Sequence, residues 1–146
     1  MNELENRFNF DLPKEWQDQT VYYFKGPNID GTDHQMILTL DRNLQHEEIG
    51  QFAKEKTDPI VKNLGGLEVL KDEDVTLENG NPAYEFICKW VPSDQLTVIK
   101  VFIFVFYDDI GFSFSCDFSR KSHKMLGGQF RKIVEKILPG TYKEIE

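Results

Sequence analysis

Cysteine, positive charge and long apolar runs are all scarce in this sequence. The 146 residues include two cysteines, Cys88 and Cys116, whose spacing matches no metal-binding or redox motif. Each lies within a strand-like segment, so we expect both to be buried free thiols rather than a disulfide. The longest apolar run, residues 101–107, is strand length and far short of the roughly 20 residues that span a membrane.

The shortage of basic residues bears on possible partners. The chain has 17 Lys and Arg against 25 Asp and Glu, which gives a net charge of -8. Such a surface repels phosphate backbones and anionic lipids, so we expect no nucleic-acid partner and no direct membrane insertion. Residues 1–7 are polar and acidic and do not resemble a secretory signal, and this predicts a cytoplasmic protein.

Length and composition favour one folded domain over residues 1–146. A chain of this size buries roughly two-thirds of its unfolded surface, enough for a core without disulfides or metals. Hydrophobic residues make up 40% of the chain, and 12 of them are Phe, an excess that requires burial.

Alternating apolar and polar residues predict strands, and apolar residues at helical spacing predict two helices. Asn43 is a plausible N-cap, Pro59 should kink or split the first helix, and the pair Asn79-Gly80 predicts a hairpin turn. Gly127 and Gly128 lie within the second helical pattern and indicate close packing or a later start. The predicted strands are 8–12, 20–24, 35–40, 68–77 with a charged bend at 71–74, 84–91, 96–107 and 112–118, and the helices are 44–64 and 122–138.

Strands joined by hairpins predict an α+β domain: a curved antiparallel sheet with two helices packed on one face. The long strand 96–107 is apolar on both sides, however. Two helices on one face leave its other side bare, and large bare apolar patches are uncommon on monomers. The second side then needs a cover from the same chain, from a second copy or from a partner protein.

We find no motif for catalysis. His34, His46 and His123 have neither metal-ligand spacing nor a neighbouring nucleophile, and we expect them to be solvated or capping residues. The acidic clusters at 72–74 and 108–109 lack the ligand spacing of a calcium loop, so we expect them to be solvated turns. The sequence therefore predicts no enzyme, no catalytic residues, no metal site and no cofactor.

Several segments together resemble a known family. The opening run, residues 10–21, resembles that of the effector-associated (Eag) chaperones of type VI secretion, which are related to DcrB-like proteins and share the PsbP-like fold. Further similarities are Asp41-Arg42, Leu64-Gly65-Gly66, residues 80–83, Trp90 before a turn and the strand at 101–103. The likeness covers nearly the whole chain. DcrB-like relatives carry a secretory or lipoprotein signal, and this sequence shows none.

The resemblance implies a function and a site. Eag chaperones are cytosolic homodimers that bind the N-terminal transmembrane segments of secreted effectors and help to load them on the spike. Alignment on the family, together with strand alternation, predicts a client-binding groove formed by Val21, Tyr23, Val98, Lys100, Phe102 and Phe104. The family often has Gln where this chain has Lys100. Lysine keeps a hydrogen-bond donor at this position but has no acceptor. The alternative is a PsbP-like soluble interaction module without a secretion role.

Overall fold

The computed structural model describes residues 13–16, 19–42, 44, 48–92, 96–107 and 109–137. The predicted strand at 8–12 and the predicted cap Asn43 lie outside these residues. Within these residues, six strands and two helices follow one another. They are β1 (Gln19–Lys25), β2 (Gln35–Asp41), α1 (Ile49–Asn63), β3 (Glu68–Thr76), β4 (Pro82–Trp90), β5 (Val98–Tyr107), β6 (Ile110–Phe118) and α2 (Arg120–Ile137).

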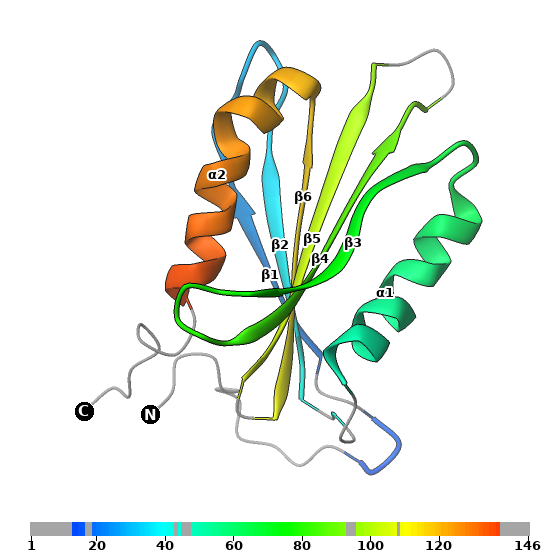
Figure 1. Ribbon diagram of the computed structural model, residues 1–146, viewed down its shortest axis with the longest axis vertical. Helices are drawn as coiled ribbons and strands as arrows, with labels where there is room; N and C mark the ends of the chain where they lie inside the picture. The colour runs from blue at the N-terminus through cyan, green and yellow to red at the C-terminus, as the bar shows by residue number, and fades with distance from the viewer. Residues whose placement is uncertain are drawn as a thin grey trace.

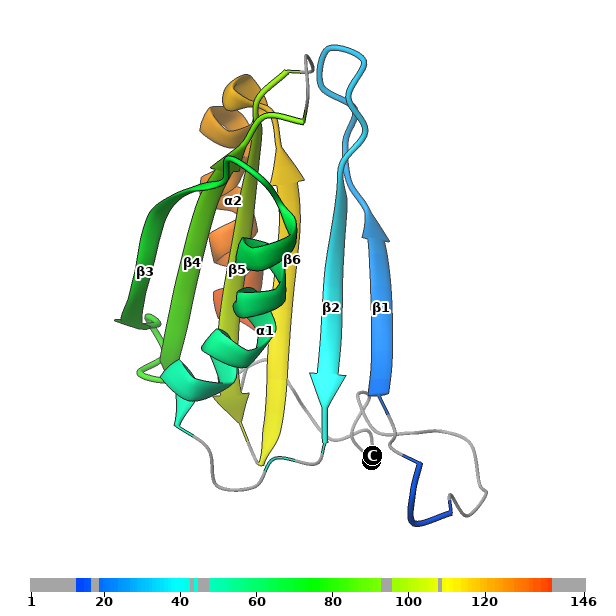
Figure 2. The same ribbon diagram turned by 90° about the vertical axis from the view of Figure 1, so that its right-hand side faces the viewer.

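All six strands form one antiparallel sheet in the order β1-β2-β6-β5-β4-β3. This confirms the predicted α+β class and the antiparallel sheet. Hairpins join β1 to β2, β3 to β4, β4 to β5 and β5 to β6. Helix α1 connects β2 to β3 at the far edge of the sheet, so the last strand, β6, pairs with β2. The strand order therefore puts β5 and β6 in the middle, with β1 and β3 at the two edges (Figure 2).

The helices do not share a face of the sheet, so that part of the prediction is wrong. Figures 1 and 2 show α1 and α2 on opposite sides of the strands. Helix α1 packs mainly on β3, β4 and β5, and α2 packs on β5 and β6. We call the two sides of the sheet the α1 face and the α2 face.

Strand β5 explains this arrangement. Phe104 packs with Phe52 of α1, while Ile103 and Val105 belong to the core beneath α2. One helix on each face covers both sides of the strand, whereas two helices on one face would have left an aromatic row bare. The long strand is therefore covered on both sides by its own chain over much of its length.

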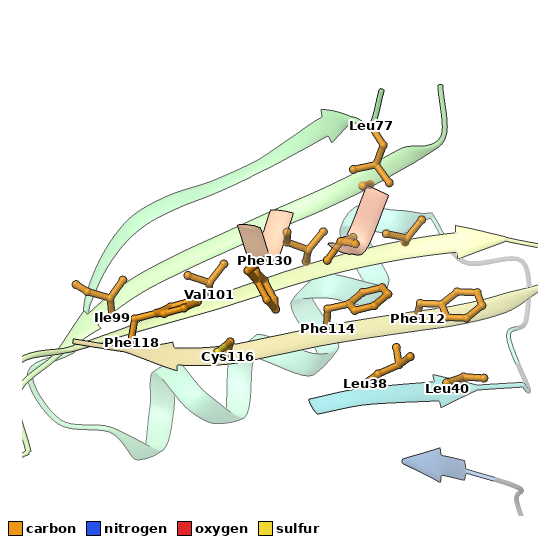
Figure 3. Close-up of a cluster of buried hydrophobic side chains, with 14 residues drawn as sticks. Leu38, Leu40, Leu77, Ile99, Val101, Phe112, Phe114, Cys116, Phe118 and Phe130 are labelled. Atoms are coloured by element: carbon orange, nitrogen blue, oxygen red, sulfur yellow. The ribbon is translucent and has the colours of Figure 1, made fainter. Parts of the chain in front are cut away.

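The larger of the two cores lies on the α2 face (Figure 3). Alternate residues of the central strands point into it, and Phe130 and Val134 of α2 close it from above. The side chains labelled in Figure 3 are Leu38, Leu40, Leu77, Ile99, Val101, Phe112, Phe114, Cys116, Phe118 and Phe130.

Several boundaries differ from the sequence prediction. Helix α1 begins at Ile49 rather than at residue 44, and its N-cap, Glu48, makes no side-chain capping bond. Pro59 lies inside α1 without splitting it. Gly127 and Gly128 lie well inside α2, which begins at Arg120, so the helix does not start late. At Gly127 an added Cβ would lie 3.1 Å from the His123 ring, which supports close packing there.

The charged segment at 71–74 is not a bend. It is the middle of β3, which pairs with β4 continuously except for an irregularity between Val69 and Lys71. The charges suit an edge strand, because they discourage pairing with a second sheet.

The predicted hairpin turn is confirmed: Gly80 has φ 88°, a left-handed conformation that glycine adopts without strain. Strand β6 begins at Ile110, two residues before the predicted start at 112.

Two glycines provide a test of the packing. At Gly111 an added Cβ would lie 2.7 Å from Cζ of the buried Phe52 ring, whereas at Gly128 it would meet no atom within 4 Å. We expect Gly111→Ala to lower the free energy of unfolding by about 1–3 kcal/mol through overpacking. Gly128→Ala should raise it by about 1 kcal/mol, since alanine favours a helix interior. Urea denaturation measures both, and a fully stable Gly111→Ala would contradict the position of α1.

The two cysteines are free, as predicted, and lie on opposite faces of the sheet. Cys88 is fully buried in the core under α1, and Cys116 is 7% exposed in the core under α2. Burial raises the pKa of both thiols to about 11. The sheet between them prevents a disulfide within one chain.

We therefore expect both thiols to react slowly with a thiol reagent at pH 8, and rapidly once the chain is unfolded. The unfolded thiols ionise near their ordinary pKa of 9.0 and the folded ones about two units higher. The unfolded state thus loses protons first, and the free energy of unfolding should fall as the pH rises above 9. Fast labelling of the native protein at pH 8 would contradict the burial of the thiols.

Candidate functional site

The six residues predicted to bind a client all lie on the α1 face, but in two separate groups. Val21 and Tyr23 belong to edge strand β1, and the other four, Val98, Lys100, Phe102 and Phe104, belong to β5. Strands β2 and β6 lie between them. The structure thus places the two groups at the borders of a wider surface rather than side by side.

The residues between the two groups were not predicted as site residues. Pairing of β1 with β2 and of β2 with β6 puts them on the α1 face, in line with Val21 and Tyr23. We call this surface the open face; it consists of Val21, Tyr23, Ile37, Thr39, Ser113 and Ser115. The alternation of small polar residues along β6 could have identified Ser113 and Ser115, whereas the contribution of β2 depends on the strand order.

Exposure separates the predicted residues further. Val21 and Tyr23 are 39% and 63% exposed, in keeping with a surface available to a partner. Phe104 is only 1% exposed because α1 covers it, and its ring meets that of Phe52 edge-on with the centroids 5.9 Å apart. A bound partner therefore cannot touch Phe104 unless α1 moves.

Phe102 links the core under α1 to the open face. Its ring is half-buried, lies parallel to that of Phe104 at 6.2 Å and is 6.1 Å from that of Phe86. Ser115 of the open face is its partner on β6. Phe102 thus forms the accessible edge of an aromatic cluster whose inner members hold α1 on the sheet.

Lys100 is held in place by two contacts. Its ammonium nitrogen, Nζ, donates to Oδ2 of Asp117 on β6 at 2.9 Å and lies 5.6 Å from the centroid of the Trp90 ring. The Lys100 side chain is 17% exposed. Asp117 balances its charge, so this position presents a neutral ion pair to a partner rather than a bare cation.

A polar stripe runs through the middle of the open face. Thr39 pairs with Ser113 and Ile37 with Ser115, so hydroxyls from β2 and β6 alternate with an apolar side chain. The Ser113 hydroxyl oxygen is buried and has no hydrogen-bond partner among the described residues. An unpaired buried hydroxyl costs on the order of 1–3 kcal/mol, and because this oxygen is covered, a partner could reach it only if the side chains over it moved.

The histidines and acidic clusters bear on other kinds of site. His34 is buried rather than solvated, because the β1–β2 hairpin brings it against the first turn of α2, where Nε2 is 2.8 Å from Oγ of Ser122. The acidic residues 72–74 lie on the β3 edge, and Asp72 accepts a hydrogen bond from the Tyr84 hydroxyl. Within the described ranges there is no cluster of metal-ligating side chains. No helix in that part of the chain is long and apolar enough to cross a membrane.

Comparison with known proteins supports the fold and the family. No curated protein matches the chain. The crystal structure of PA94 from Pseudomonas aeruginosa, a protein of unknown function, is similar over 95% of this chain and 96% of its own, with a TM-score of 0.72 and 14% identity. CalU16 from Micromonospora echinospora covers 88% of this chain and 86% of its own, at a TM-score of 0.34 and 10% identity.

At 14% identity the likeness to PA94 extends to the fold alone, and its agreement over almost the whole of both chains supports the α+β architecture. The family match is more specific and confirms the DcrB part of the sequence resemblance. Because the DcrB family matches residues 8–115, well over half of the 146 residues, this chain belongs to the DcrB family.

Proposed function

We propose that this protein is a cytoplasmic chaperone that binds an N-terminal transmembrane helix of a type VI secretion effector and helps to load the effector on the spike. Its role is binding without catalysis, and its client lies on the open face. The resemblance to Eag chaperones supplies the kind of client. The observation that carries the proposal is the exposure of Val21 and Tyr23 on a sheet face that continues to Phe102.

The chemistry of the open face suits such a client. A transmembrane helix in water exposes more apolar surface than a soluble protein tolerates, and a partly apolar sheet face shields it. Transmembrane helices also associate through small polar side chains, which hydrogen-bond across the interface. Thr39 and Ser115 carry hydroxyls of this kind between the apolar borders.

The dimensions agree as well. Neighbouring strands lie about 4.8 Å apart, so β1, β2 and β6 together are roughly 10 Å wide between their axes. A helix with its side chains is about 10–12 Å across. One client helix thus fits along these three strands, beside α1 and in reach of Phe102. The Lys100–Asp117 ion pair lies on the same face.

Adjacent residues of β1 provide a matched test. Tyr23 is on the open face, whereas Phe24, 42% exposed, is on the α2 face. Tyr23→Asp should abolish retention of the co-expressed effector in a pull-down, because a carboxylate there opposes an apolar helix. Phe24→Asp should retain the effector, and both variants should fold, since both side chains are exposed.

Deletion of the effector's N-terminal apolar helices is the second arm of this test. The proposal requires that the truncated effector is no longer retained. Retention of the truncated effector would favour the alternative, a PsbP-like module that binds a folded partner. Retention of the full effector by Tyr23→Asp would show that the client does not use the open face.

We also propose that the protein is a homodimer, on a different structural argument from the one that the sequence suggested. The sequence expectation rested on an uncovered apolar side of β5, and α1 covers part of that side, Phe104 included. The remaining exposed apolar side chains on the α1 face include Val21 and Tyr23 of edge strand β1. Light scattering at micromolar concentration should give about twice 17.1 kDa, and the monomer mass alone would contradict the dimer.

A further inference from the structure

A pocket of about 130 Å³ lies on the α2 face, on the opposite side of the sheet from the open face. Its lining residues come from the β1–β2 hairpin, from the end of β6 and from α2, and Figure 1 shows the hairpin and α2 on that side of the sheet. Its walls are chiefly apolar: Phe24, Met36, Phe118, Leu126, Phe130 and Ile133. An apolar cavity of roughly 150 Å³ holds one benzene, so this pocket has room for a single aromatic or branched aliphatic side chain.

Hydrogen bonds hold the walls of the pocket in place. The carbonyl of Pro27 accepts a bond from Nδ1 of His34 at 3.0 Å, and Nε2 of His34 bonds to the Ser122 hydroxyl at 2.8 Å. These bonds tie the β1–β2 hairpin to the first turn of α2. Both nitrogens of the buried His34 are thereby used, so the pocket offers a ligand an apolar interior with fixed walls.

The charge of the chain is divided unevenly around this pocket. Helix α2 carries six of the 17 basic residues and one of the 25 acidic residues, a net charge of +5. The rest of the chain has 11 basic and 24 acidic residues, a net charge of -13. A basic helix on such an acidic protein attracts anionic groups to one limited region of its surface.

Three basic residues lie in the pocket wall or close to it along α2. Lys25 lines it from β1, and Lys132 and Lys136 lie one helical turn after the lining residues Gln129 and Ile133. All three side chains are exposed, and none has an ion-pair partner in the part of the chain that the structure describes.

Most of the other charges near the pocket are ion-paired. Arg131 points to the far side of α2, where it contacts Glu85 at 3.2 Å and Glu135 at 3.4 Å. On the hairpin, Asp30 pairs with Lys121, and Asp33 accepts a hydrogen bond from Asn28 at 2.8 Å. Asn28 is neutral, so Asp33 keeps its negative charge, but three lysines outweigh it and the charge left for a partner near the pocket is positive.

We propose that this pocket and its three lysines bind an acidic peptide segment of a partner protein, with one aromatic or branched aliphatic side chain inserted in the pocket. The apolar walls take the anchor side chain, and the lysines pair with carboxylates before and after it in the segment. An anionic membrane fits less well, because the charge of -13 on the rest of the chain repels it. The site lies across the sheet from the proposed client site and is independent of it.

Fluorescence anisotropy with the full-length protein tests the proposal. The probes are labelled peptides with three glutamates on each side of a central residue, which is Phe, Leu, Trp or Ala. We expect saturable binding that is at least about tenfold weaker for the Ala peptide, given what burial of one large apolar side chain contributes. Binding should also weaken as salt rises, since the lysines are exposed.

Two variants separate the parts of the site. Phe24→Asp should weaken binding of the Phe peptide about tenfold or more, and Lys25→Glu combined with Lys132→Glu should do the same. Tyr23→Asp is the matched control, because Tyr23 is on the other face, and it should leave peptide binding unchanged.

Three outcomes would overturn the proposal. The first is the absence of saturable binding by any of the Phe, Leu and Trp peptides. The second is equal affinity for the Phe and Ala peptides, which would mean charge attraction without an anchor. The third is binding to phosphatidylserine vesicles with no binding to the peptides, which would make the basic surface a membrane contact.

Discussion

Strand β5 has large apolar side chains on both of its sides, and neither side can be left in water. The chain meets this constraint by placing α1 over one side and α2 over the other. Neither helix is wide enough to cover the whole six-stranded sheet. Each face therefore has a covered region around β5 and a region beyond its helix; the open face lies beyond α1, and the pocket lies where α2 meets the β1–β2 hairpin.

The two uncovered regions differ in chemistry because the strands alternate. On the α1 face, β2 and β6 supply Thr39, Ser113 and Ser115, and the surface is a polar stripe between apolar borders. On the α2 face the same strands supply Met36 and Phe118, and an apolar pocket results. One set of strands thus produces two surfaces with different preferences for a partner.

The strands could be predicted from sequence because alternation is a local property. The buried side of both cysteines followed from this alternation, the Asn79-Gly80 turn from its own two residues, and the long strand from a continuous apolar run of strand length. The helix positions did not follow, because both sides of β5 are apolar and an apolar stripe on a helix fits either one. The six predicted site residues do share one face of the sheet, as strand alternation predicts, but the insertion of β2 and β6 between Val21 and Phe102 depends on long-range pairing. The burial of Phe104 depends on α1 in the same way.

The two edges of the sheet differ in kind. Edge strand β3 carries Lys71, Asp72, Glu73 and Asp74 at its centre, whereas β1 has no charged residue before Lys25 at its end. Backbone pairing with another chain is therefore favoured at one edge and opposed at the other. If two molecules joined along β1, both outer edges of the combined sheet would be copies of β3. A third chain that approached through its own β3 would then meet the same charged residues. Growth through the sheet would stop at two chains, and the protein would be protected against fibre formation by the sequence of a single strand.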